Sequence, residues 1–381
     1  MTPAARAAAA IGVLDRVLAG EAAEKVLTQW GRGARYAGSG DRAAVRDIVY
    51  DCLRCRRSFA ALGGGPGGRG LVLGAARAAG LQALWFDGSA HGPAPADDPP
   101  GHSPEGLEAL DCPDWLAPAL QAALGTDFAP VMQALRQRAP VFLRVNAARC
   151  TVAQVLAALA DEGIGARPHP LSKNALEVTE NARKIQNSSA YAQGWVELQD
   201  AASQAVADAV PLRDGQRVLD LCAGGGGKTL ALAARARVRL YAHDANPRRM
   251  ADLPARAARA GAKVTIADNP EKTAPYDVIL TDVPCSGSGS WRRDPEGKWA
   301  LSAERLADLC AVQARILDRA AALAAPGAVL AYATCSMLRA ENEDQVAAFL
   351  SRHPDWHLED SRRLTPLQGG DGFGVALLKR I

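Results

Sequence analysis

Two cysteines, each followed by a serine, are the residues in this 381-residue sequence best suited to covalent chemistry. Cys285 lies in the segment DVPCSGSGSWRRDPEGKW, and Cys335 lies in the segment YATCSMLRAENEDQV. Each follows a stretch typical of a buried β-strand, so both thiols face one cleft if the two strands are neighbours. A single buried cysteine is more often an inert small hydrophobe, but two at successive strand ends favour catalysis.

A pair of thiols suits methyl transfer to carbon 5 of a pyrimidine. Carbon 5 is a poor nucleophile, but a thiolate that adds to carbon 6 makes it enamine-like and able to accept a methyl group. The proton on carbon 5 must then leave and the thiol must be eliminated, steps that a second nearby group can assist. Asp282, beside the ring, could stabilise charge on the pyrimidine. The attacking cysteine must be a thiolate, which nearby cations or a helix N-terminus would favour.

The stretch VLDLCAGGGGKT, residues 218–229, predicts a nucleotide-binding corner between a strand and a helix. Glycine lets the backbone approach a ligand closely, and the new helix offers free N–H groups. A phosphate-binding G-x-x-x-x-G-K-[ST] loop is excluded because Cys222 stands where its first glycine belongs. The G-x-G-x-x-G pattern fails at Thr229. A nucleotide-like ligand held without a phosphate remains, and S-adenosylmethionine is one.

The pattern of strands and helices from residue 201 onward predicts an open, mostly parallel, doubly wound sheet. Strands are expected at residues 217–222, 238–243, 263–267, 277–281 and 328–334, with two more near 356–358 and 375–379. Asp220 lies in the first strand, and three further acids end the next three strands: Asp244, Asp268 and Asp282. Ligands of such sheets lie beyond the carboxyl ends of the strands. We therefore expect Asp244 to bind ribose hydroxyls and Asp268 to lie near the adenine, although any one such acid is more often a turn or helix cap.

The region before the predicted sheet consists of two parts with different predicted secondary structure. Residues 1–135 are predicted to be helical, with a helix that begins near Asp41, and residues 1–80 carry twelve Lys/Arg against six Asp/Glu. This basic block indicates a polyanionic partner, with a solvated helix face as an equal alternative. Residues 139–200 are predicted to form a small α/β subdomain, whose amphipathic helix is capped by Thr151.

Composition excludes several other classes of protein. No segment approaches 18 uninterrupted apolar residues, and the N-terminus lacks the solid apolar core of a secretory signal. We therefore expect a cytoplasmic protein without a membrane span. Eight cysteines in a chain of this length predict no disulfide framework. Cys52 and Cys55 form a C-x-x-C, but a zinc site needs a second pair, so no metal is expected.

The three motifs together resemble the RsmB/Sun/Nop family of RNA cytosine-5 methyltransferases, which use S-adenosylmethionine. VLDLCAGGGGKT resembles motif I of that family, DVPCSGSGSWRRDPEGKW resembles motif IV and YATCSMLRAENEDQV resembles motif VI. FLRVNA, WVELQDAASQ and GGDGFG are also similar, so the resemblance covers residues 141–381. It implies that Cys335 is the nucleophile and that Cys285 helps to release the product. The implied cofactor residues are Cys222, Ala223, Gly224, Gly225, Gly226, Gly227, Lys228, Asp244, Asp268 and Asp282.

The resemblance also implies a domain plan and a substrate. Residues 1–135 would be an RNA-binding domain like NusB, residues 139–200 an RRM-like subdomain, and residues 201–381 the methyltransferase domain. The expected substrate is 16S rRNA, with tRNA as the alternative. The protein is expected to be a monomer and to use no metal.

One residue departs from the family, which usually has proline where Gly225 stands. A more flexible loop would bind the cofactor less tightly, so Gly225→Pro should keep activity or tighten binding.

Two alternatives remain open at this point. A DNA cytosine methyltransferase uses one cysteine in a PC motif, whereas the added cysteine at 335 favours RNA; an RNA uridine methyltransferase is a related possibility. A catalytically silent RNA-binding factor would need neither thiol.

Basic and aromatic residues after Cys285 favour stacking on an unpaired RNA base, with a packed loop as the alternative. These residues are Trp291, Arg292, Arg293, Lys298 and Trp299.

Overall fold

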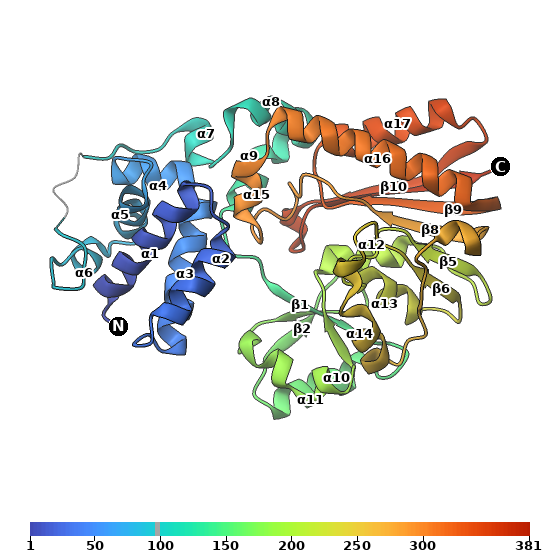
Figure 1. The fold of residues 1–381 in the computed structure, drawn as a ribbon, viewed down its shortest axis with the longest axis horizontal. Helices are drawn as coiled ribbons and strands as arrows, with labels where there is room; N and C mark the ends of the chain where they lie inside the picture. The colour runs from blue at the N-terminus through green and yellow to red at the C-terminus, as the bar shows by residue number, and fades with distance from the viewer. Residues whose placement is uncertain (96–99) are drawn as a thin grey trace. The chain divides into compact units, whose positions relative to one another are not determined.

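The computed structural model of the protein describes residues 1–95 and 100–381 (Figure 1). The chain divides into two compact units. The first comprises Met1–Arg138 and Trp291–Ala300, and the second comprises Ala139–Ser290 and Leu301–Ile381. The polypeptide therefore leaves the second unit after Ser290, contributes ten residues to the first, and returns.

The first unit is helical, as its alanine-rich pattern predicts. Its core is formed by apolar side chains that recur at helical spacing, such as Leu14, Val49 and Leu71. The helix predicted to begin near Asp41 begins two residues earlier, because the Asp41 carboxylate accepts from Gly38 N and lies in the first turn. The helices are α1 (Pro3–Leu18), α2 (Ala23–Gly33), α3 (Ser39–Arg54), α4 (Arg56–Gly63), α5 (Gly68–Ala78), α6 (Gln82–Trp85), α7 (Gly106–Ala109), α8 (Ala117–Leu124), α9 (Phe128–Leu135) and α15 (Pro295–Ala300).

The second unit begins with a small antiparallel sheet in the order β2-β3-β1-β4. Its strands are β1 (Val141–Val145), β2 (Ala166–Pro168), β3 (Ala175–Val178) and β4 (Val196–Leu198), packed on helices α10 (Val152–Asp161) and α11 (Ser189–Ala192). Thr151 caps α10 as predicted, since its hydroxyl accepts from Gln154 N. Strand β2 was not predicted, because three residues ending in proline are too short to show alternation.

The larger sheet has seven strands in the order β10-β11-β9-β8-β5-β6-β7. Five strands are parallel, whereas β11 and β10 add antiparallel to the edge beyond β9. The strands are β5 (Arg217–Asp220), β6 (Arg239–Ala242), β7 (Thr265–Ile266), β8 (Tyr276–Asp282), β9 (Ala324–Thr334), β10 (Trp356–Leu364) and β11 (Phe373–Arg380). All seven predicted strands are present, and the doubly wound fold is confirmed.

Helices cover both faces of this sheet, which gives two separate cores (Figure 1). Alternate residues of one strand enter opposite cores: Leu219 packs on the face of α16 (Ala303–Leu323) and α17 (Glu343–Arg352), and Val218 packs on the face of α12 (Ala201–Ala209) and α13 (Gly227–Ala233). Helix α14 (Leu253–Ala260) packs beside β6. Successive crossovers reverse direction at β5, so the carboxyl ends of β5 and β8 form the switch point where ligands of such folds bind.

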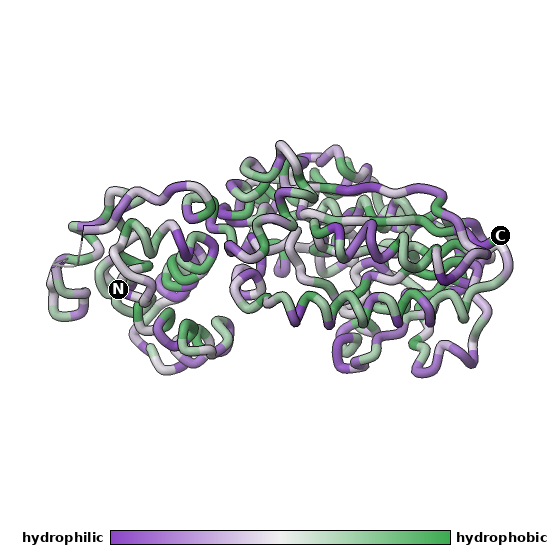
Figure 2. Tube along the Cα trace, turned by 90° about the horizontal axis from the view of Figure 1, so that it is seen from above, coloured by the Kyte–Doolittle hydropathy of each residue, from purple (hydrophilic) through white to green (hydrophobic). Residues whose placement is uncertain are grey.

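Hydrophobic and hydrophilic residues intermix along the chain (Figure 2). Within the described residues, no helix combines the length and apolar character needed to cross a bilayer.

Candidate active site

The two motif cysteines meet at the carboxyl ends of β8 and β9. These strands pair in parallel, which confirms that they are neighbours. The Sγ atoms of Cys285 and Cys335 lie 3.3 Å apart. Backbone hydrogen bonds hold the two loops together, from Val283 N to Ala333 O (3.0 Å) and from Gly289 N to Cys335 O (2.9 Å). Residues 50 positions apart therefore share one site, as their spacing after successive strands predicts.

The two thiols are not equivalent. The hydrogen bond with the Cys285 thiol lowers the pKa of Cys335, although burial and the charge of Asp282 oppose it. The positive charge of Lys228 acts in the same direction as the hydrogen bond. The same hydrogen bond, together with burial, raises the pKa of Cys285 well above its ordinary value. The opposite directions of these two shifts favour Cys335 over Cys285 as the thiolate of the pair.

A buried carboxylate supports the Cys285 loop. Glu341 is fully buried and accepts from Ser286 N (2.8 Å) and from Gln313 Nε2 (3.0 Å). The same Gln313 amide donates to Pro284 O (3.0 Å), so it fixes the residue before the cysteine. Neither Glu341 nor Gln313 was predicted, because a buried glutamate within the acidic run ENEDQ has no local signal that separates it from its exposed neighbours.

Serine hydroxyls join the two cysteine loops. Ser288 Oγ lies 3.0 Å from Ser336 Oγ and accepts from Met337 N (2.8 Å). Asn342 Nδ2 donates to Ser336 O (3.0 Å) and Leu338 O (2.8 Å), which closes the turn after Cys335. Both thiols thus sit on loops whose backbones are fixed by buried polar contacts, a requirement for reproducible catalytic geometry.

Lys228 and Asp282, both predicted to serve the cofactor site, form an ion pair. Lys228 Nζ lies 2.7 Å from Asp282 Oδ2. Burial disfavours the charged lysine, but the charge of Asp282 and its hydrogen bond outweigh that cost, so the pKa of Lys228 is raised. The ammonium also lies over the Phe373 ring, 4.9 Å from its centroid. The GGDGFG segment, which contains Phe373, therefore belongs to the site.

The glycine loop follows β5 and contacts Asp244. One carboxylate oxygen of Asp244 accepts from Gly224 N (2.9 Å) and the other from Asn246 N (2.9 Å). Gly224 and Gly226 adopt left-handed conformations, with φ of 51° and 81°, which explains why glycine is needed at both. A Cβ at Gly226 would also lie 2.2 Å from Leu253 Cδ1.

Asp220 lies beneath this loop. Its Oδ2 accepts from Thr229 Oγ1 (2.7 Å), whereas its Oδ1 is buried and has no hydrogen-bond partner among the described residues. Burial raises the pKa of Asp220 to about 7. Burial likewise raises the pKa of Cys222, so that thiol is neutral. An unpartnered buried carboxylate oxygen marks a position where a polar ligand or water would be accommodated.

Asp268 and the basic and aromatic run after Cys285 have other surroundings. Asp268 is exposed beyond β7, the edge strand of the sheet. Within the first unit, Lys298 Nζ donates to Arg54 O (3.0 Å) and Trp299 Nε1 to Leu53 O (2.6 Å). Lys298 is buried, and burial lowers its pKa to about 8. The packed-loop alternative therefore describes this segment better than an exposed stacking surface.

No metal site is evident at the C-x-x-C or elsewhere among residues 1–95 and 100–381. Cys52 and Cys55 are buried in the first unit, where burial raises the pKa of each. No cluster of three or more histidine, cysteine or acidic side chains in the described part of the chain could hold a metal ion.

Comparisons with known proteins agree with this geometry. Residues 207–377 match the family model "16S rRNA methyltransferase RsmB/F", and residues 112–185 match the ferredoxin-like domain model of the same proteins. The ribosomal RNA small subunit methyltransferase B of Salmonella newport is 36% identical over 284 residues, which cover 70% of this chain and 66% of that protein. The chain thus spans about two thirds of the length of this curated relative.

Two solved structures share the fold. The crystal structure of PH0851 superposes with a TM-score of 0.77 at 22% identity and covers 100% of this chain and 99% of its own. NSun6 from Pyrococcus horikoshii, solved with SFG, has a TM-score of 0.63 at 17% identity over 72% of this chain and 99% of its own. At these identities the likeness establishes the fold alone. The two family models and the curated relative show that this chain belongs to the RsmB/F family of S-adenosylmethionine-dependent methyltransferases.

Proposed function

We propose that the protein methylates carbon 5 of a cytosine in RNA, with S-adenosylmethionine as the methyl donor and Cys335 as the nucleophile. The observation that carries this proposal is the thiol pair, whose sulfur atoms lie 3.3 Å apart and whose hydrogen bond lowers the pKa of Cys335. A covalent mechanism needs a nucleophilic thiolate, and a second thiol beside it can assist release of the product. A silent RNA-binding factor would need neither this pairing nor the buried scaffold behind it.

The residues around the glycine loop fit the proposed cofactor. Asp220 Oδ1 is buried without a partner among the described residues, Gly224 and Gly226 keep the loop free of side chains, and Asp244 stands at the end of β6. NSun6, a protein of the same fold, has been solved with SFG, an S-adenosylmethionine analogue. We assign the loop from Cys222 to Lys228, with Asp244, Asp268 and Asp282, to cofactor binding. When bound there, S-adenosylmethionine would supply the methyl group.

The protein's own groups account for the other steps. Cys335 Sγ, as thiolate, attacks carbon 6 of the cytosine and forms a carbon–sulfur bond, which makes carbon 5 nucleophilic. As that bond forms, the ring nitrogen takes up a proton from water. The Asp282 carboxylate accepts hydrogen bonds from this N–H and from the amino group, while Lys228 holds the carboxylate in place. After carbon 5 has gained the methyl group, its proton leaves to water, and the Cys285 thiol, 3.3 Å from the Cys335 sulfur, assists release by donating a hydrogen bond to the sulfur that departs. The carbon–sulfur bond then breaks and returns the electron pair to Cys335.

We infer that the substrate is 16S rRNA, with tRNA as the alternative. The support is the name of the curated relative and of the family model. The RNA is expected to contact the basic helical domain at residues 1–135, the small subdomain at residues 139–200 and the methyltransferase domain at residues 201–381. A ribosomal RNA substrate accords with the predicted cytoplasmic location. Because the target base must leave its stack to reach the thiols, an unpaired loop or bulge is favoured over duplex.

The direct test of the target is bisulfite sequencing of total RNA from cells that lack the gene. Those cells should be complemented with the wild-type protein or with Cys335→Ala. We expect one 5-methylcytosine in 16S rRNA to disappear and to be restored by the wild type alone. A missing site in tRNA would select the alternative substrate. Restoration by Cys335→Ala would contradict the proposed nucleophile, and an unchanged methylation map would favour the silent factor.

A further inference from the structure

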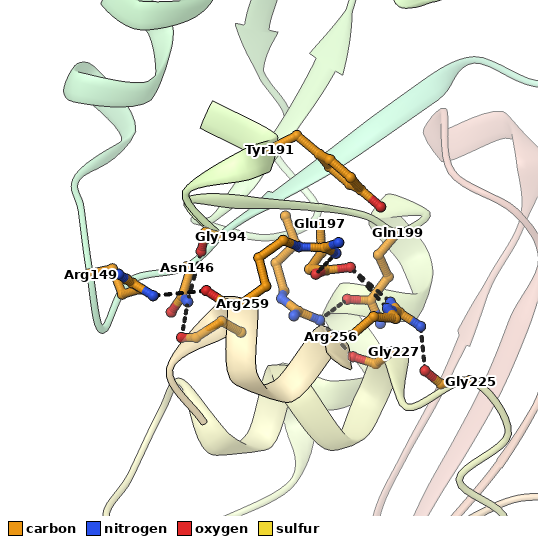
Figure 3. A network of polar contacts seen from close by, with 12 residues as sticks. Asn146, Arg149, Tyr191, Gly194, Glu197, Gln199, Gly225, Gly227, Arg256 and Arg259 are labelled. Carbon is orange, nitrogen blue, oxygen red and sulfur yellow. Dashed lines mark hydrogen bonds and ion pairs between the residues drawn. The ribbon is translucent and has the colours of Figure 1, made fainter. Parts of the chain in front are cut away.

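An arginine outside the glycine loop, Arg256, holds the loop backbone at Gly225. Gly225 is exposed and stands between Gly224 and Gly226. Its carbonyl oxygen accepts a hydrogen bond from Nη1 of Arg256, which lies on α14 (Figure 3). Consecutive glycines lose more conformational entropy on ordering than any other residues, so a fixed partner for this carbonyl has a large effect on the loop.

Arg256 is itself fixed by a buried carboxylate of the small sheet. Glu197 on β4 is 3% exposed and accepts from Arg256 Nη2 (2.9 Å) and Nε (3.2 Å). The other oxygen of Glu197 pairs with Arg259, whose guanidinium lies 4.1 Å from the centroid of the Tyr191 ring. Figure 3 shows both arginines converging on Glu197, while only Arg256 continues to the loop. A guanidinium clamped in this way is pre-organised to hold a carbonyl.

A second arginine holds the carbonyl two residues farther along. Arg144 on β1 is buried and donates from Nη1 to Gly227 O (2.6 Å). The small sheet therefore fixes the loop at two points, through β4 and Arg256 at Gly225 and through β1 and Arg144 at Gly227. Neither contact is local in sequence, because Arg256 lies 31 positions and Arg144 lies 83 positions from its partner.

We propose that Arg256 is a positioning residue for the cofactor, which rigidifies the loop at Gly225 as a proline there would. The inference rests on the proposed function, in which this loop binds S-adenosylmethionine. A proline at 225 is compatible with the structure on three counts. Gly225 is not in the left-handed region, and its N–H donates no hydrogen bond within the described chain. The one atom close to an added Cβ is Arg256 Nη1 at 3.1 Å, the end of a flexible side chain that has to shift slightly in the wild type and is absent from Arg256→Ala.

The test compares Arg256→Ala with Arg259→Ala, a matched control on the same helix. Both variants remove one partner of Glu197, but only the first removes the contact with Gly225. Dissociation constants for S-adenosylmethionine should be measured by titration calorimetry on the full chain, together with the melting temperature. We expect Arg256→Ala to weaken binding about tenfold and Arg259→Ala less than threefold at similar melting temperatures. Equal weakening by both variants would overturn the inference.

A rescue separates positioning from general stability. Gly225→Pro introduced into Arg256→Ala should restore most of the lost affinity, because it constrains the loop without the guanidinium. If that double variant does not fold, Gly225→Ala in the same background should give partial recovery. A folded double variant that binds no better than Arg256→Ala would overturn the proposal, since a defect confined to α14 cannot be repaired in the loop.

Asp244→Ala distinguishes the failure of this inference from the failure of the proposed function. Asp244 accepts from the loop at Gly224 N, so its loss should abolish binding if this is the cofactor site. Normal binding by Asp244→Ala would reject the site assignment and the inference with it. Lost binding by Asp244→Ala, combined with wild-type binding by Arg256→Ala, would reject the role of Arg256 alone.

Discussion

Lys228 of the glycine loop and Asp282 of β8 form an ion pair of 2.7 Å that connects the proposed cofactor site to the strand leading to Cys285. Both charges act on Cys335: the ammonium lowers the pKa of this thiol and the carboxylate raises it. The ion pair thus has two opposing effects on the pKa of Cys335. Substituting one partner at a time should show the effect of each.

Lys228→Met and Asp282→Asn should therefore shift the titration of Cys335 in opposite directions. We expect the midpoint to rise by roughly one pH unit in the first variant and to fall in the second. The measurement is the pH dependence of iodoacetamide alkylation at Cys335, followed by mass spectrometry of the peptide that contains it. Shifts of the same sign in both variants would show that the ion pair does not set the reactivity of this thiol.

Glu341→Ala should destabilise the protein, because Glu341 is buried and accepts from Ser286 N and Gln313 Nε2. Leaving these donors unpaired costs about 2–4 kcal/mol in the free energy of unfolding. Urea denaturation measures this change. The matched control is Glu343→Ala, an exposed neighbour that forms a surface ion pair with Arg363 and is expected to change stability by about 1 kcal/mol or less. Similar losses in the two variants would argue against the supporting role of Glu341.

Asp220 should make stability depend on pH, because burial raises its pKa in the folded protein to about 7. The unfolded chain has the ordinary value of about 3.9, so the folded state binds more protons between these limits. The contribution of Asp220 is fully present below about pH 4 and is lost as the pH rises through about 7. Asp220→Asn cannot titrate. The unfolding free energy of the wild type relative to this variant should fall from pH 4 to 7, and a constant difference would contradict the shift.

Sequence patterns were sufficient to predict the features that depend on local order. Apolar stretches followed by glycine or aspartate predicted where the strands end. Cys222 and Asp282 lie at the carboxyl edge of the sheet, as that pattern predicts. The parallel pairing of β8 and β9 then brought Cys285 to Cys335, a meeting that the sequence supported only if the strands were neighbours.

The features that were missed depend on contacts between distant segments. Glu341 supports a loop 55 residues away, and Arg256 holds a carbonyl 31 residues away. No hydrophobic period or capping pattern reports such pairings. The basic and aromatic run after Cys285 had the composition of a nucleic-acid surface, but Lys298 and Trp299 use their polar atoms on carbonyls at the end of α3. Composition alone does not show whether a cation is buried.

The most direct test of the account is covalent trapping of RNA by the two cysteine variants. Purified Cys285→Ala and Cys335→Ala proteins should be incubated with unmodified 16S rRNA and S-adenosylmethionine, then resolved on a denaturing gel. Cys285→Ala should accumulate a protein–RNA adduct, because Cys335 still attacks but release is impaired, whereas Cys335→Ala should form none. An adduct with Cys335→Ala and none with Cys285→Ala would exchange the two roles, and no adduct with either would contradict the covalent mechanism.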